Sequence, residues 1–116
     1  MSLNFKKYQE FATFLEQLSS DVTKTQLDAP TLRQRLAVLQ QWFVEQIVPL
    51  SDVDSREQSY QTEMSKQLRL LEIDVMFFQG ARQSSTAQAR MKTICDRITT
   101  LIQYCHAILQ PEAPED

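Results

Sequence analysis

Hydrophobic residues recur along the chain in alternating steps of three and four, the spacing of one face of an α-helix. The first such segment predicts a helix over about residues 4–24, which Ser2 or Asn4 can cap. Its apolar stripe consists of Tyr8, Phe11, Leu15, Leu18 and Val22.

A second helix is predicted to start within the stretch LDAPTLRQRL. Asp28 can cap it, and Pro30 suits its first turn, where a missing backbone N–H leaves no hydrogen bond unmade. Because Val48 precedes Pro49, it is biased away from helix, and the polar segment PLSDVDS then predicts an exposed connection. The stripe of this helix is Leu32, Leu36, Leu39, Phe43 and Ile47.

A third helix is predicted from a cap at Asp54 or Ser55 to an end near Gly80. A fourth starts at Ser84 or Ser85 as caps and stops before Pro111. The stripe of the third is Tyr60, Met64, Leu68, Leu71, Val75 and Phe78. The stripe of the fourth is Ala87, Met91, Ile94, Ile98, Leu101, Cys105 and Ile108.

These four segments predict an all-α fold, an antiparallel up-down-up-down four-helix bundle in which the third and fourth helices are longest. Gly80 is the only glycine, and few residues outside the predicted connections break a helix. A length of 116 residues suits one hydrophobic core. We therefore expect a single domain over residues 1–110, followed by a flexible acidic tail over residues 111–116.

A second apolar stripe runs along the third predicted helix. Leu70, Ile73 and Phe77 cluster about 140° away from the first stripe, and Asp74 lies at the edge between the two apolar faces. In one interpretation a bundle helix touches two neighbours and needs a wide apolar arc. In the other, Leu70, Ile73, Asp74 and Phe77 form an exposed interface for a partner or a second copy of the chain.

Charge and hydropathy narrow the classes of partner. Twelve Lys and Arg residues against fifteen Asp and Glu give a net charge of −3, so we expect no nucleic-acid partner. No apolar run reaches the roughly 18 residues of a membrane span, and the amino terminus lacks the apolar core of a signal peptide.

Cys95 and Cys105 are separated by a helical rise of about 15 Å, too far for a disulfide. These features predict a cytoplasmic protein with two reduced thiols.

Few residues suggest catalysis, and the sequence predicts no catalytic, metal-binding or cofactor-binding site. His106 is the only histidine, and its neighbour Cys105 points about 100° away from it on a helix, which disfavours a Cys-His nucleophile or a shared metal. We expect a surface histidine near a helix C-terminus. A phosphotransfer bundle is one alternative. Domains of that class resemble one another in an exposed mid-helix histidine that is followed by a lysine and a small residue, and YCHAILQPE has neither of these two residues.

A small helical enzyme is a second alternative. The stretch LRLLEIDVMFFQGAR is similar to the first-helix pattern of the all-α chorismate mutases, with Arg69, Asp74 and Arg82 at matching residue types. It departs from that pattern in its Arg spacing and in lacking a second acidic position. Such an enzyme would gather Arg69, Arg82 and a carboxylate around a cavity. Otherwise Arg69 pairs with Glu72 and Asp74 is solvated.

The segments SYQTEMSKQLRLLEIDVMFFQGARQSSTAQAR and RITTLIQYCHAIL resemble the cyanobacterial PatD family, small proteins that limit the frequency of heterocyst formation. The likeness spans roughly residues 59–109, with a fainter one in MSLNFKKYQEFATFLEQL. It implies a non-enzymatic regulator that binds the tubulin-like division protein FtsZ and influences its assembly. Because an acidic protein is not drawn to an acidic filament by net charge, we expect an apolar anchor. A homodimer would present two such faces.

Overall fold

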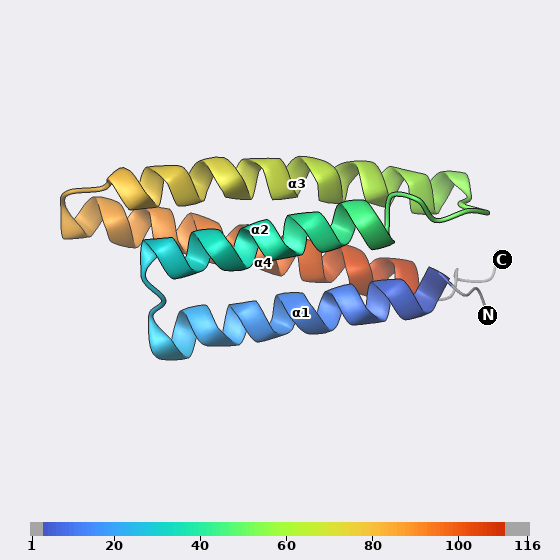
Figure 1. Ribbon diagram of the computed structural model, residues 1–116, viewed down its shortest axis with the longest axis horizontal. Coiled ribbons are helices and arrows are strands. Elements are labelled where there is room, and N and C mark those ends of the chain that lie inside the picture. The colour runs from blue at the N-terminus through green and yellow to red at the C-terminus, as the bar shows by residue number, and fades with distance from the viewer. Residues whose placement is uncertain (1–3, 111–116) are drawn as a thin grey trace, which may run out of the picture.

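The computed structural model describes residues 4–110, which form four α-helices and no strand (Figure 1). The helices are α1 (Asn4–Thr25), α2 (Ala29–Gln46), α3 (Ser55–Gly80) and α4 (Ser84–Leu109). The all-α prediction is confirmed, and α3 and α4, with 26 residues each, are the longest helices. Ser2 and the predicted tail over 111–116 lie outside the described residues.

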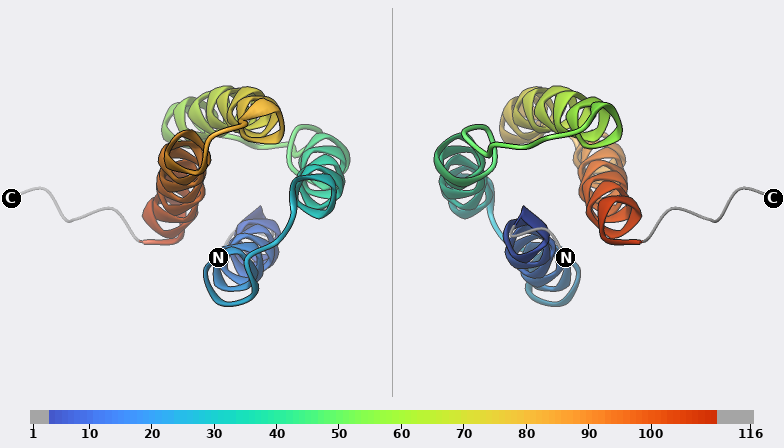
Figure 2. Two further views of the ribbon diagram at one scale, coloured as in Figure 1. Left: turned by 90° about the vertical axis from the view of Figure 1, so that its left-hand side faces the viewer. Right: turned by 90° about the vertical axis from the view of Figure 1, so that its right-hand side faces the viewer.

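The four helices stand at the corners of a four-sided arrangement (Figure 2). Each of α1 and α3 packs against both α2 and α4. The most extensive packing is between α3 and α4, and the least extensive is between α1 and α2. At the left-hand end of Figure 1, α3 and α4 extend beyond the end of α1 and the start of α2.

Two of the predicted helix caps are present. A side-chain oxygen of Asp28 accepts a hydrogen bond from the backbone N–H of Thr31 at 2.8 Å, and Asp54 accepts one from Glu57 at 2.8 Å. The bonds from Thr31 hold the pKa of Asp28 below its usual value. The predicted serine cap of α4 is wrong: Ser84 already belongs to the helix, and Gln83 at the cap position makes no side-chain capping bond.

The predicted stripes supply the hydrophobic core. Every stripe residue of α1 and α2 is buried, as are the central residues of the α3 and α4 stripes. Burying one such side chain contributes about 1.5–3 kcal/mol. Phe78, Ala87 and Met91 are only half-buried, and they line an open pocket of about 370 Å³ together with Val22 at the end of α1. Tyr60, near the start of α3, is half-buried as well. The core therefore comes from the periodic positions, and burial decreases toward the ends of the α3 stripe and the start of the α4 stripe.

A buried polar network joins α1, α3 and the α2–α3 connection. The Tyr8 hydroxyl donates to Oε2 of Glu57 at 2.7 Å and accepts from Nε2 of Gln61 at 2.7 Å. Asn4 is the first residue of α1, and its amide donates to Oε2 of Glu57 at 3.1 Å and to the carbonyl of Ser51 at 3.0 Å. Burial raises the pKa of Tyr8. Since all these side chains are bonded, the network fixes α1 against α3 without an unpaired polar group.

Candidate interaction surface

The second apolar stripe of α3 faces outward. Ile73 is 40% exposed, Met76 61% and Phe77 53%, whereas Leu70 is half-buried. A single exposed apolar side chain is ordinary on a protein surface, but three large ones within five residues of one helix are not scattered. We call Ile73, Met76 and Phe77 the α3 strip. Its residues are not part of the core, so the face they form is open to a partner.

Asp74 occupies a different position from its neighbours in the candidate interface. Its Oδ2 atom lies 2.6 Å from Nε of Arg97 on α4, and its side chain is only 7% exposed. Nη1 of the same Arg97 donates to Oε1 of Gln67 at 3.4 Å. The expectation of a solvated Asp74 is therefore wrong, because the carboxylate turns from the edge of the apolar face toward α4. It positions α3 and offers little surface to a partner.

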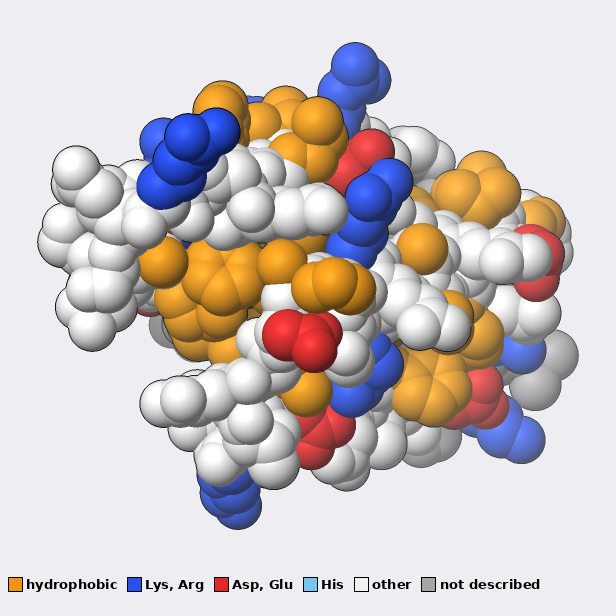
Figure 3. Space-filling model, turned by 60° about the vertical axis from the view of Figure 1, so that its left-hand side comes forward, with side chains coloured by type: hydrophobic (Ala, Val, Ile, Leu, Met, Phe, Trp, Pro, Cys, Tyr) orange, Lys and Arg blue, Asp and Glu red, His pale blue; other side chains and the backbone are white. Residues whose placement is uncertain are grey.

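Cations surround the α3 strip. The Arg90 guanidinium on α4 lies 4.5 Å from the centre of the Phe77 ring, and Lys66 and Arg69 are exposed on α3 itself. Figure 3 shows hydrophobic side chains on the upper side of the molecule, where α3 lies, with Lys or Arg side chains to either side and an Asp or Glu side chain next to them. The expected Arg69–Glu72 pair is absent within residues 4–110, and Glu72 instead accepts from Nε2 of Gln40 at 2.9 Å.

Open grooves between α2 and α3 run beside the strip. One, of about 440 Å³, is lined by Gln40, Arg69 and Ile73 among others. The next, of about 420 Å³, includes Met76 and Arg33 of α2. Both apolar and polar side chains line these grooves, so they suit a chain segment that lies along α3.

The groove of about 440 Å³ beside the strip does not contain the pair of arginines expected for a chorismate-mutase-like site. Arg69 and Glu72 line it, but Arg82 does not. Arg82 follows the end of α3, and the helix from Arg69 to Gly80 alone rises about 16 Å. The two arginines therefore do not gather around one cavity there.

The remaining candidate groups are dispersed. Nε2 of His106 lies 3.2 Å from Oε1 of Glu16, and both side chains are about half exposed, as expected for a surface histidine. Burial raises the pKa of the Cys105 thiol to about 12 and raises that of Cys95 as well. Both cysteines are free. Within residues 4–110, no cluster of His, Cys, Asp or Glu side chains could hold a metal ion.

A second apolar surface, which the hydrophobic stripes did not predict, is a groove of about 220 Å³ between α1 and α2. Trp42 stacks on Phe11 with ring centres 5.7 Å apart and makes a T-shaped contact with Phe14, ring centres 5.2 Å apart. Phe14 is 42% exposed and Val38, also in the groove, is 62% exposed. The signal available was that Phe14 and the only tryptophan both lie off the predicted stripes.

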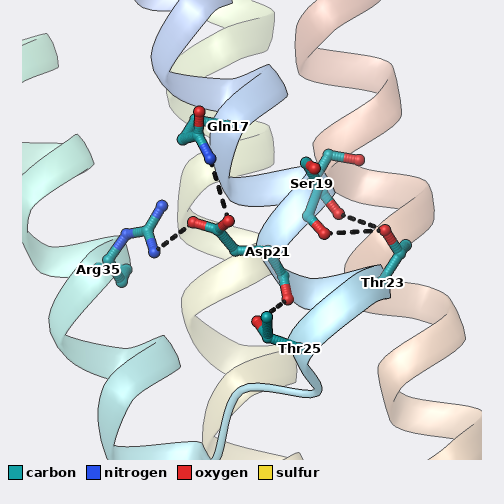
Figure 4. Close-up of polar contacts among 7 residues, drawn as sticks. Gln17, Ser19, Asp21, Thr23, Thr25 and Arg35 are labelled. Atoms are coloured by element: carbon teal, nitrogen blue, oxygen red, sulfur yellow. Dashed lines mark hydrogen bonds and ion pairs between the residues drawn. The ribbon is translucent and has the colours of Figure 1, made fainter.

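Polar groups beside this groove satisfy one another (Figure 4). Asp21 accepts from Nη1 of Arg35 at 2.9 Å and from Nε2 of Gln17 at 3.0 Å. The bond from Arg35, and then that from Gln17, hold the pKa of Asp21 below its usual value. Thr23 and Thr25 donate their hydroxyl groups to carbonyl oxygens within α1. The Asp21–Arg35 pair thus joins α1 to α2, the neighbouring helices with the least extensive packing.

The sequence model of the CRR41 C-terminal domain family matches residues 7–106. The chain belongs to this family. The match to the CRR41 C-terminal domain runs from the first turn of α1 to the last turns of α4 and so includes both surfaces described above. No curated protein and no solved structure matches the chain. Over the described residues, every helix is too short or too polar to cross a membrane.

Proposed function

We propose that this member of the CRR41 C-terminal domain family is a non-enzymatic regulator that binds FtsZ through the outer face of α3. By modulating FtsZ assembly it would limit heterocyst frequency. The observation that carries the binding role is the α3 strip, in which Ile73, Met76 and Phe77 are exposed together. The choice of FtsZ rests on the resemblance of residues 59–109 to the PatD family.

The surroundings of the strip support a docking role. Large apolar side chains on one face of a helix are a common anchor for protein partners. Directly beside the strip, the Asp74–Arg97 pair ties α3 to α4. A preorganised helix loses less conformational entropy when a partner binds.

The proposal takes the four helices as one antiparallel up-down-up-down bundle acting in the cytoplasm without a cofactor and without nucleic acid. A homodimer through the same α3 strip is the alternative use of this face. In that case Ile73 and Phe77 would be covered by a second copy, and dissociation would have to precede FtsZ binding.

Direct binding to purified FtsZ tests the proposal. Phe77→Glu places a charge in the strip and should weaken FtsZ binding at least about tenfold, as truncation of an interface anchor does. Val38→Glu is the matched control, because Val38 is also an exposed apolar residue but lies in the α1–α2 groove. Absence of FtsZ binding by the wild type, or equal losses in both folded variants, would overturn the proposal.

A further inference from the structure

We infer that the α3 strip and its cations take an acidic protein segment, one in which a bulky apolar side chain is flanked by Asp or Glu. This inference rests on the proposed function in taking α3 as the partner face. The proposed function names the partner protein, and the inference adds which kind of segment of that partner α3 would bind.

The local charge of the outer α3 face carries the inference. Lys66 and Arg69 are exposed there, and neither forms an ion pair with another described residue. Between Lys66 and Gly80 on α3, Glu72 is the one exposed carboxylate, and the two exposed cations Lys66 and Arg69 outnumber it. The face is therefore cationic although the whole chain carries a net charge of −3.

Cations also approach the strip from the neighbouring helices. Arg90 of α4 lies over the Phe77 ring, and Arg33 of α2 lines the same groove as Met76. Charges attract a ligand mainly within a Debye length, about 8 Å at physiological ionic strength, so the charges beside the strip count for more than the net charge of the chain. Glu72, which lines both grooves, is the carboxylate that opposes these cations. The expectation of an apolar anchor was based on the net charge, and the inference adds a role for the local cations beside that anchor.

The shape of the face favours a peptide chain over an anionic membrane surface. The grooves of about 440 and 420 Å³ run along α3 beside the strip, and a flat bilayer cannot enter them. Arg69 lines the first groove and presents donors to backbone carbonyls or carboxylates of a bound segment, whereas the amide of Gln40 already donates to Glu72 and to the carbonyl of Leu68. An apolar anchor on the strip would then bring its acidic neighbours next to Lys66, Arg69 and Arg90.

Selection from a random peptide library displayed on phage tests the inference without FtsZ. The baits are the full chain, Lys66→Glu/Arg69→Glu, and the control Lys6→Glu/Lys24→Glu. The control makes the same change in net charge on α1, which lies diagonally across from α3 (Figure 2). Wild type and control should both enrich peptides with Asp or Glu beside Leu, Phe or Met. The selected peptides should bind Lys66→Glu/Arg69→Glu at least about tenfold more weakly.

Selected peptides without an acidic excess, equal binding to both double variants, or no binder at all would each overturn the inference. Binding of the chain to phosphatidylglycerol vesicles that depends on Lys66 and Arg69, in place of peptide enrichment, would also overturn it in favour of a membrane surface. If acidic peptides are selected as expected but purified FtsZ does not bind, the proposed partner is wrong and the inferred chemistry stands.

Discussion

The carboxylate of Asp74 on α3 lies 2.6 Å from Nε of Arg97 on α4, and both groups belong to a contact that is largely shielded from water. Asp74 follows Ile73, which points to the outside of the molecule. Two consecutive residues of α3 thus belong to the face proposed to bind a partner and to a structural ion pair. Rotation of α3 that hid Ile73 would have to break the pair.

Asp74→Asn should lower the free energy of unfolding by about 1–3 kcal/mol. The substitution keeps the shape of the side chain but removes the charge that compensates Arg97. Because the Arg97 side chain is 28% exposed, water offsets part of the loss, and the effect stays below that of a fully buried pair. Urea unfolding followed by circular dichroism measures it.

Asp96→Asn is the control for this prediction. It removes the pair of Asp96 with Lys92, whose side chains are 66% and 79% exposed, so the change should stay below about 0.5 kcal/mol. Equal effects of the two substitutions would contradict a structural role for Asp74.

Ile73→Glu should leave the helical content and the melting temperature nearly unchanged, because the side chain already reaches water at 40% exposure. The adjacent core residue Leu71 is 1% exposed, and Leu71→Asp should unfold the chain by burying an unpaired charge. Circular dichroism melts compare the two. Unfolding of the Ile73 variant would show that this position contributes to the core after all.

Tyr8→Phe should lower the free energy of unfolding by about 1–3 kcal/mol. The ring still fills its place, but Glu57 loses a donor and Gln61 loses an acceptor inside the protein. Tyr60→Phe removes a hydroxyl from a half-buried ring that packs on Tyr104, and should change stability by less than about 0.5 kcal/mol. If chemical denaturation gives the same stability for both variants, the buried network does not contribute as described.

Alkaline pH should destabilise the protein through Cys105. Burial raises the pKa of this thiol from 9.0 to about 12, so the folded state keeps the proton that the unfolded chain releases. The stability from this difference is fully present below about pH 9 and is lost as the pH rises toward 12. At pH 10.5 the loss is about 2 kcal/mol.

Denaturation series at pH 8 and pH 10.5 on wild type and Cys105→Ala measure this loss. The variant is less stable at both values because it leaves a cavity, but it lacks the thiol and should show a smaller decrease. Parallel decreases in the two proteins would assign the alkaline effect to other groups, such as Tyr8, whose pKa burial also raises.

The hydrophobic period predicted four helices and their core positions, because burial of one face dictates that spacing. It could not assign Leu70, Ile73 and Phe77 to core or surface, since that depends on how α3 rotates between α2 and α4. The Asp74–Arg97 pair could not be predicted from the sequence either, because it depends on how α3 and α4 are placed relative to one another. The α1–α2 groove was missed for a similar reason: Phe14 and Trp42 become a surface only where those helices pack loosely.

Co-sedimentation with polymerising FtsZ tests the central claim most directly. Wild type, Phe77→Glu and Val38→Glu would each be mixed with FtsZ and GTP, and the polymer pelleted by centrifugation. We expect wild type and Val38→Glu to pellet with the polymer and to change its amount, whereas Phe77→Glu should stay in the supernatant and leave the amount unchanged. A folded Phe77→Glu protein that acts on FtsZ as the wild type does would contradict this expectation.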